Sequence, residues 1–212
     1  MYAFTNGLEE MKLQQSHVEN ALALAKEQGV IRPRDLEQRG IPRHYAYLLS
    51  RAGQLRRVGR GLYTHPDNPP TENHSLALIG KRAPEAVVCL LSALRFHELT
   101  TQLPSETWVA VHPKARPPQI PEIPLRVVRF SGRALTEGVD SHVLEGVTVR
   151  VTSPAKTVAD CFKYRNKIGR DVAVEALRDA ISQRKATVRE LDHFAHICRV
   201  ARTMRPYLEL YL

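Results

Sequence analysis

The first part of the chain pairs an apolar stripe of helical spacing with clear start and stop residues. The stripe predicts a helix over 16–28, in which Ser16 and Glu19 form a capping box and Gly29 ends the helix. Residues 1–15 carry no comparable pattern. We therefore expect them to be a flexible N-terminal tail.

The pattern then continues with two short helices and a hairpin. Helices are predicted over 33–38 and 42–52, each with a proline in its first turn. Strands are predicted over 54–58 and 62–65, on either side of a glycine-rich turn at 59–61. The order of helix, helix, tight turn, helix and hairpin is that of a winged helix-turn-helix.

These patterns divide the chain into three parts. We predict a winged helix-turn-helix domain over 16–66, a polar, proline-rich linker over 67–74, and a mixed α/β domain over 75–212. In the last domain the strands expected are 86–90, 107–112, 125–130, 142–144 and 147–151. The helices expected there are 75–82, 92–99, 154–164, 171–183, one that follows the capping box of Thr187 and Glu190, and a last turn in 206–212. The fold class is therefore α+β, with C-terminal helices.

The predicted helix over 42–52 has two different faces. Its packing face is expected to carry Tyr45, Leu48, Leu49 and Ala52. Its other face carries polar and basic side chains, as a helix in the major groove of DNA would require: Arg43, His44, Tyr47, Ser50 and Arg51.

The distribution of charge supports a polyanionic partner. The chain has 31 lysines and arginines against 22 acidic residues, a net charge of +9. Between Arg32 and His65 stand eight arginines but only Asp35 and Glu37 as acids. Arginine suits bidentate contacts with phosphate and guanine, so duplex DNA is the partner we expect. The alternative is a winged helix used for protein contact, with its arginines as a solvated surface. The candidate DNA-binding residues are Arg34, Arg43, His44, Tyr47, Arg51, Arg56, Arg57 and Arg60.

Several classes of protein are disfavoured. No apolar run is long enough to span a membrane, and the N-terminus has no secretory pattern, so we expect a cytoplasmic protein. Cys89, Cys161 and Cys198 stand among apolar residues and are expected in the core, as is Trp108. We expect no cofactor, no metal and no catalytic residues.

Five sequence strings resemble a known family, the AbiE-type (abortive infection) antitoxins. Three are in the first domain: G-I-P-R at 40–43, G-Q-L at 53–55 and R-V-G-R-G-L-Y at 57–63. Two are in the second: L-S-A-L at 91–94 and V-T-S-P-A-K-T-V-A-D at 151–160. The last is similar to the family's S-P-x-K/R-T-hydrophobic-x-D signature, whose residues here are Ser153, Pro154, Lys156, Thr157 and Asp160.

The resemblance implies a bacterial protein with two roles. The winged helix would repress its own operon at inverted repeats in the promoter, and the second domain would neutralise a nucleotidyltransferase-like toxin encoded beside it. The chain departs from the family near Ile31 and Arg32, where the usual Thr or Ser cap of the second helix is missing.

Other interpretations of single motifs stay open at this point. Ser153 and Lys156 match the S-x-x-K motif of penicillin-binding enzymes, but the partner motifs are absent and a helix cap explains Ser153 better. Lys156 and Asp160 are one helical turn apart, so they form either a surface pair or part of a partner-binding face. His193 and His196 share a helical face from which Cys198 points away, so a metal site is disfavoured.

The second domain also carries a basic cluster of Arg126, Arg129 and Arg133. We interpret it as a solvated strand edge rather than an extension of the DNA-binding surface or a contact for an acidic toxin. For the whole chain, the alternative to an antitoxin is a stand-alone repressor whose second domain senses a ligand or dimerises. A nuclease targeted to DNA is a further alternative, although the sequence lacks its usual catalytic pattern.

Overall fold

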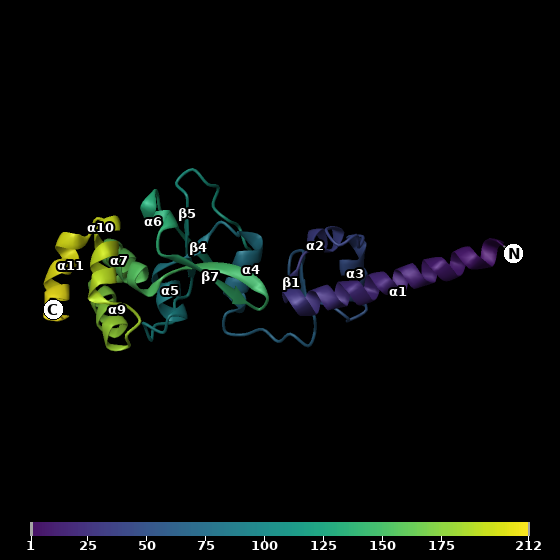
Figure 1. Ribbon diagram of the computed structural model, residues 1–212, viewed down its shortest axis with the longest axis horizontal. Coiled ribbons are helices and arrows are strands. Elements are labelled where there is room, and N and C mark those ends of the chain that lie inside the picture. The colour runs from purple at the N-terminus through teal and green to yellow at the C-terminus, as the bar shows by residue number, and fades with distance from the viewer. Residues whose placement is uncertain (1, 212) are drawn as a thin grey trace. The chain divides into compact units, whose positions relative to one another are not determined.

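The computed structural model describes the backbone of residues 2–211 and the side chains of residues 12–211, and it is a mixed α+β protein as predicted (Figure 1). The chain forms two compact units. Unit 1 comprises the residues up to Lys81 together with Val143–Val147, and unit 2 comprises Arg82–His142 and Thr148–Leu212.

Unit 1 combines helices with a small sheet. Its elements in chain order are α1 (Tyr2–Gln28), β1 (Val30–Ile31), α2 (Pro33–Glu37), α3 (His44–Arg51), β2 (Arg56–Gly59), β3 (Leu62–Thr64) and α4 (His74–Arg82), whose last residue belongs to unit 2. The sheet has the order β1-β3-β2 and both pairings are antiparallel. The sequence pattern did not predict β1, because two residues are too few to show a period.

The core of unit 1 fixes the position of α3. Tyr45, Ala46 and Leu49 of α3 are buried against α1, which contributes Ala21 and Ala25. The remaining buried apolar residues come from both sides of α2 and from the sheet: Leu24, Ile31, Leu36, Ile41, Leu55 and Tyr63. Burial of this stripe orients the other side of α3 toward solvent.

Helix α1 is longer than the sequence predicted. It begins at Tyr2, so the expectation of a flexible tail over 1–15 is wrong from residue 2 onward, and Met1 lies outside the described residues. The segment after Gly7 consists almost entirely of good helix formers, which extend the helix without an apolar stripe. Ser16 accordingly lies inside the helix, where its hydroxyl accepts a hydrogen bond from Asn20 at 3.2 Å.

Residues expected to form a linker belong instead to unit 1. The carboxylate of Glu145 accepts hydrogen bonds from the backbone amide of Thr71 at 2.7 Å and lies 2.7 Å from Nδ1 of His74. Lys81, near the end of α4, pairs with Asp35 at 2.8 Å. These polar contacts involve single residues far apart in the chain. The polar, proline-rich composition placed the linker at 67–74, whereas the boundary between the units falls after Lys81.

Unit 2 is built on a mixed five-stranded sheet. The strands are β4 (Val87–Val88), β5 (Thr107–Val111), β6 (Leu125–Arg129), β7 (Val139–Leu144) and β8 (Val147–Thr152), in the order β6-β5-β4-β8-β7. Strand β4 is antiparallel to β5 and parallel to β8, and β5 is parallel to β6. The hairpin across Glu145 and Gly146 and the other predicted strands are confirmed, but the strand predicted over 86–90 is only Val87–Val88, and Leu90 already begins a helix.

The helices of unit 2 gather around one central helix. They are α5 (Leu90–Phe96), α6 (Arg133–Thr136), α7 (Pro154–Lys163), α8 (Arg165–Ile168), α9 (Arg170–Ser182), α10 (Val188–Ile197) and α11 (Ala201–Leu208), followed by the 3₁₀ turn η1 (Glu209–Tyr211). Helices α5, α9 and α10 all pack on α7 (Figure 1). The predicted core positions of Cys89, Cys161, Cys198 and Trp108 are confirmed, since all four are buried.

The N-terminal caps predicted for these helices are confirmed, whereas the extent of the last helix was not predicted. Ser153 accepts from the backbone amide of Lys156 at the start of α7, and Thr187 and Glu190 form the expected capping box of α10. Helix α11, by contrast, runs through Pro206, where only a new turn was expected. Pro206 is the sixth of its eight residues, and a proline in a helix usually marks a first turn.

Candidate nucleic-acid interface

A tight turn sets the angle between α2 and α3. Gly40 has a φ of +73°, a conformation that favours glycine, and its amide donates to the carbonyl of Glu37 at 2.9 Å. The amide of Ile41 donates to the carbonyl of Leu36 at 3.0 Å, and both of these side chains are buried. The turn is therefore held by hydrogen bonds and by apolar anchors at once.

The start of α2 lacks a side-chain cap from Arg32, as its sequence suggested. The carboxylate of Asp35 compensates by accepting from the backbone amide of Arg32 at 2.8 Å and from its guanidinium at 3.0 Å. Burial alone would raise the pKa of Asp35. The hydrogen bonds from Lys81 and Arg32 outweigh burial and hold this pKa below its ordinary value.

The outward face of α3 carries the side chains that the sequence singled out. His44, Tyr47 and Arg51 are all exposed, and the guanidinium of Arg51 lies 5.8 Å from the centre of the Tyr47 ring. The ring of His44 packs 4.8 Å from that of Tyr45, which is buried. These contacts restrict the two outward rings without covering them.

Leu48 also lies on the outward face, so the prediction that it packs inward is wrong. Its exposed fraction is 50%, and Ala52 is exposed as well. On a helical wheel Leu48 lies about 100° from the middle of the arc that Tyr45, Ala46 and Leu49 define, so a narrow buried stripe excludes it. An exposed leucine therefore stands beside Tyr47 among polar neighbours.

Arg43 is not a free cation in this structure. Its guanidinium forms an ion pair with Glu37, and this hydrogen bond raises the pKa of Arg43 above its ordinary value. The sequence signal for the pair was present, since Glu37 is one of only two acids in the basic segment. The pair links α2 to the first turn of α3.

The hairpin supplies the second group of arginines. Arg56 donates to the carbonyl of Asn68 at 3.0 Å and Arg57 to that of Gly59 at 3.2 Å, while both side chains remain exposed. Arg60 is exposed in the turn between β2 and β3. Among the described side chains, Arg34, Arg51, Arg56 and Arg57 have no carboxylate partner. Unit 1 thus presents arginines on α2, α3 and the hairpin.

The signature in 153–160 has a different environment from the one expected. Lys156 and Asp160 form an ion pair whose side chains are 0% and 1% exposed, so the prediction of a surface pair or partner-binding face is wrong. The hydrophobic periodicity of this segment could not predict the burial of the pair, because α7 is covered on all sides and buries eight of its ten residues.

Other side chains complete the surroundings of this pair. The ammonium of Lys156 lies 4.7 Å from the centre of the Phe130 ring, and the thiol of Cys198 donates to Asp160 at 3.2 Å. Burial raises the pKa of Asp160, although Lys156 acts in the opposite direction. Thr157 lies one turn before Cys161 and donates to the carbonyl of Ser153 at 2.8 Å. Lys156, Thr157 and Asp160 thus lie in the core, whereas Ser153 and Pro154 at the start of α7 are partly exposed.

The remaining motifs are not brought together into a site. Cys198 is buried beside Asp160, whereas His193 and His196 are exposed on α10. Between residues 12 and 211, no three side chains of His, Cys, Asp or Glu are grouped as metal ligands. None of the described helices combines the length and apolarity needed to cross a membrane.

The predicted basic cluster of unit 2 is three separate contacts. Arg126 lies 5.4 Å from the ring centre of Trp108, and Arg129 donates to the carbonyls of His112 and Ala115 at 2.8 and 2.6 Å. Arg133, the first residue of α6, pairs with Glu137, which directly follows the last residue of that helix.

Comparison with known proteins bears on unit 1 most directly. Residues 20–66 match the AbiEi antitoxin family of transcriptional regulators. The matched segment begins inside α1 and ends just after β3, so it contains the turn, α3 and the hairpin described above. The resemblance drawn from the sequence strings of the first domain is thereby confirmed.

A solved structure shares the wider fold. The crystal structure of the RV2827C protein from Mycobacterium tuberculosis matches with a TM-score of 0.54 at 16% identity, over 84% of this chain and 71% of that one. At this identity the likeness concerns the fold alone. A comparison with curated protein sequences finds no significant match.

Proposed function

We propose that unit 1 is a winged helix-turn-helix that binds duplex DNA and that the protein regulates transcription of its own operon. The observation that carries this proposal is the outward face of α3, where His44, Tyr47 and Arg51 are exposed while Tyr45 and Leu49 anchor the helix. A recognition helix needs this combination of a fixed backbone and free polar side chains. The AbiEi match over the same residues supports it.

The proposed complex assigns different tasks to the two groups of arginines. Helix α3 enters the major groove, where Arg43, His44, Tyr47 and Arg51 face base edges. Arg56, Arg57 and Arg60 of the hairpin, with Arg34 of α2, contact the phosphate backbone and set the register. For Arg43 this requires exchange of its Glu37 partner for DNA. The operator would be an inverted repeat in the upstream promoter, as the family resemblance implies.

For unit 2 we propose the antitoxin role that the resemblance implies, directed at a nucleotidyltransferase-type toxin. The signature from Ser153 to Asp160 would serve this role indirectly, because Ser153 caps α7 and the buried pair of Lys156 and Asp160 fixes it in the core. We assign the protein no catalytic step. Action on its own promoter would place it in the cytoplasm.

An electrophoretic mobility shift on the native upstream promoter, with a scrambled duplex as control, tests the DNA-binding proposal. Tighter binding to the promoter supports it. Absence of binding to both duplexes at low salt contradicts DNA binding, and equal binding to both contradicts regulation of the protein's own operon. The antitoxin proposal is tested separately by co-expression with the product of an adjacent nucleotidyltransferase gene. Growth inhibition that persists in the presence of this chain contradicts the antitoxin role and leaves a stand-alone repressor.

A further inference from the structure

Unit 2 carries a basic groove between α6, the end of α7 and α10. Two hollows of about 380 and 410 Å³ adjoin there, since Arg133, His196 and Ile197 line both of them. Arg189, Asp192 and His193 complete the first hollow, and Lys163 and Arg199 belong to the second. We call this surface the α10 groove.

The charge of the α10 groove is not balanced by the protein itself. Lys163, Arg189 and Arg199 line it without an ion pair to any described carboxylate, and Asp192 is its one lining acid. Arg133 differs, because Glu137 already pairs with it. Lys163 and Arg199 thus line the second hollow, and Arg189 lines the adjoining first one.

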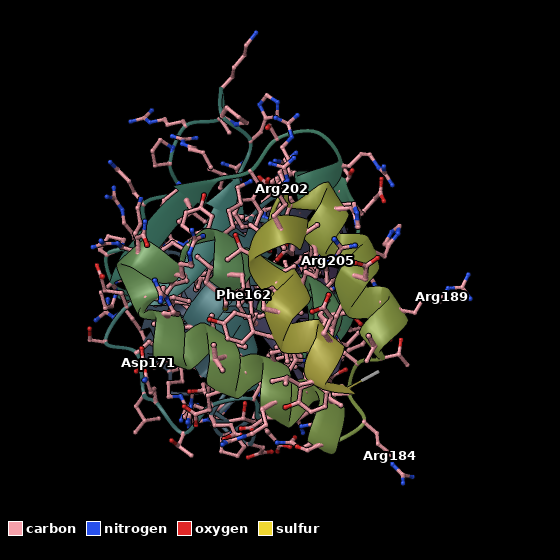
Figure 2. All side chains as sticks on the ribbon, turned by 90° about the vertical axis from the view of Figure 1, so that its left-hand side faces the viewer. Phe162, Asp171, Arg184, Arg189, Arg202 and Arg205 are labelled. Carbon is pink, nitrogen blue, oxygen red and sulfur yellow. The ribbon has the colours of Figure 1, made fainter. Side chains whose placement is uncertain are left out.

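The backbone at Arg199 adds a second observation. Arg199 follows the C-cap of α10 with a φ of +60°, a left-handed conformation that glycine adopts with less strain. Arg184, after the C-cap of α9, has a φ of +56° and does not line the groove. Arg184 and Arg189 both project away from the helices, at separate places on unit 2 (Figure 2). Arg199 and Arg184 thus share a positive φ and are both exposed, but only Arg199 lines the groove.

We propose that the α10 groove binds a small phosphate-bearing molecule, with Lys163, Arg189 and Arg199 as its phosphate contacts. Guanidinium and ammonium groups form charge-assisted hydrogen bonds with phosphate oxygens. The hollows have the size of small-molecule sites. This inference is independent of DNA binding by unit 1.

Isothermal titration calorimetry of the full chain with inorganic pyrophosphate at low salt tests the proposal. The informative variant is Arg199→Gly, which removes the guanidinium and also relieves the positive φ, so loss of folding cannot explain its result. Arg184→Gly makes the same chemical and conformational change outside the groove. We expect Arg199→Gly to weaken pyrophosphate binding at least about tenfold and Arg184→Gly to leave it unchanged.

Three results would overturn the proposal. The first is absence of pyrophosphate binding by the native chain. The second is equal weakening of pyrophosphate binding by the two glycine variants, which would mean a diffuse charge effect. The third is loss of binding to a scrambled DNA duplex by Arg199→Gly without any change in pyrophosphate binding, which would assign the groove to nucleic acid. Because neither arm depends on the promoter, failure here leaves the proposed function of unit 1 standing.

Discussion

The ammonium of Lys156 and the carboxylate of Asp160 form an ion pair that is almost completely excluded from solvent, one turn apart on α7. Removal of one partner leaves an uncompensated charge in the core. We therefore expect Lys156→Met to lower the free energy of unfolding of the chain by about 3–5 kcal/mol in urea denaturation. Replacing both residues, as Lys156→Met with Asp160→Leu, should cost less than the single change.

The exposed pair of Arg133 and Glu137 has the same spacing and provides the control. Arg133→Met should change stability far less than Lys156→Met, because solvent screens the exposed pair. Equal losses for the two variants would show that the burial of Lys156 has no energetic consequence.

The contrast between these pairs shows what the sequence could predict. Spacing correctly placed Lys156 and Asp160 one turn apart, and Ser153 at the cap, because caps and helical spacing are local properties. Burial is set by α5, α9 and α10, which come from distant parts of the chain. The prediction that Leu48 packs inward was wrong for a related reason, since the exposure of Leu48 depends on how wide a stripe of α3 is covered by α1.

The candidate interface was more predictable than the domain boundary. Every arginine proposed for DNA contact is exposed, as most arginines in folded proteins are. The pairing of Arg43 with Glu37 and that of Asp35 with Lys81 depend on side-chain geometry, which no periodicity encodes.

The pairing of Asp35 with Lys81 predicts a dependence of stability on pH. Because the folded pKa of Asp35 lies below its ordinary value of 3.8, its contribution is complete above that pH and is lost as the pH falls through the folded value. Urea denaturation at several pH values should show that Asp35→Asn is less stable than the native chain at pH 7. The difference should shrink as the pH falls below 3.8. A difference that stays constant with pH would contradict the ionised pairing.

The pairing of Glu37 with Arg43 predicts an unusual gain of function. Glu37→Gln removes a carboxylate from the surface of unit 1 and releases the guanidinium of Arg43. Binding to duplex DNA should tighten at low salt, because a carboxylate that repels the phosphates is gone and Arg43 is released from its partner. Arg43→Ala should act in the opposite direction. Weaker binding by Glu37→Gln in fluorescence anisotropy would show that the pair itself orients α3 for DNA.

The exposure of Leu48 predicts a contact with thymine. An apolar side chain on a recognition helix can contact the C5-methyl group of thymine in the major groove. Replacing thymine by uracil in the promoter duplex removes only that methyl group, and we expect a loss of about 0.8 kcal/mol for each contacted position. Leu48→Ala should bind both duplexes alike. Equal discrimination by the native chain and by Leu48→Ala would refute the contact and leave DNA binding intact.

The most direct test of the account is a salt titration of promoter binding by fluorescence anisotropy, comparing the native chain with the double variant Arg43→Ala and Arg51→Ala. Both residues lie at the outward side of α3, and both are exposed, so the change should leave the fold of unit 1 unaltered. We expect promoter affinity to fall steeply with salt in the native chain, and the double variant to bind promoter and scrambled duplex equally. Undiminished preference of the double variant for the promoter would contradict base recognition by α3.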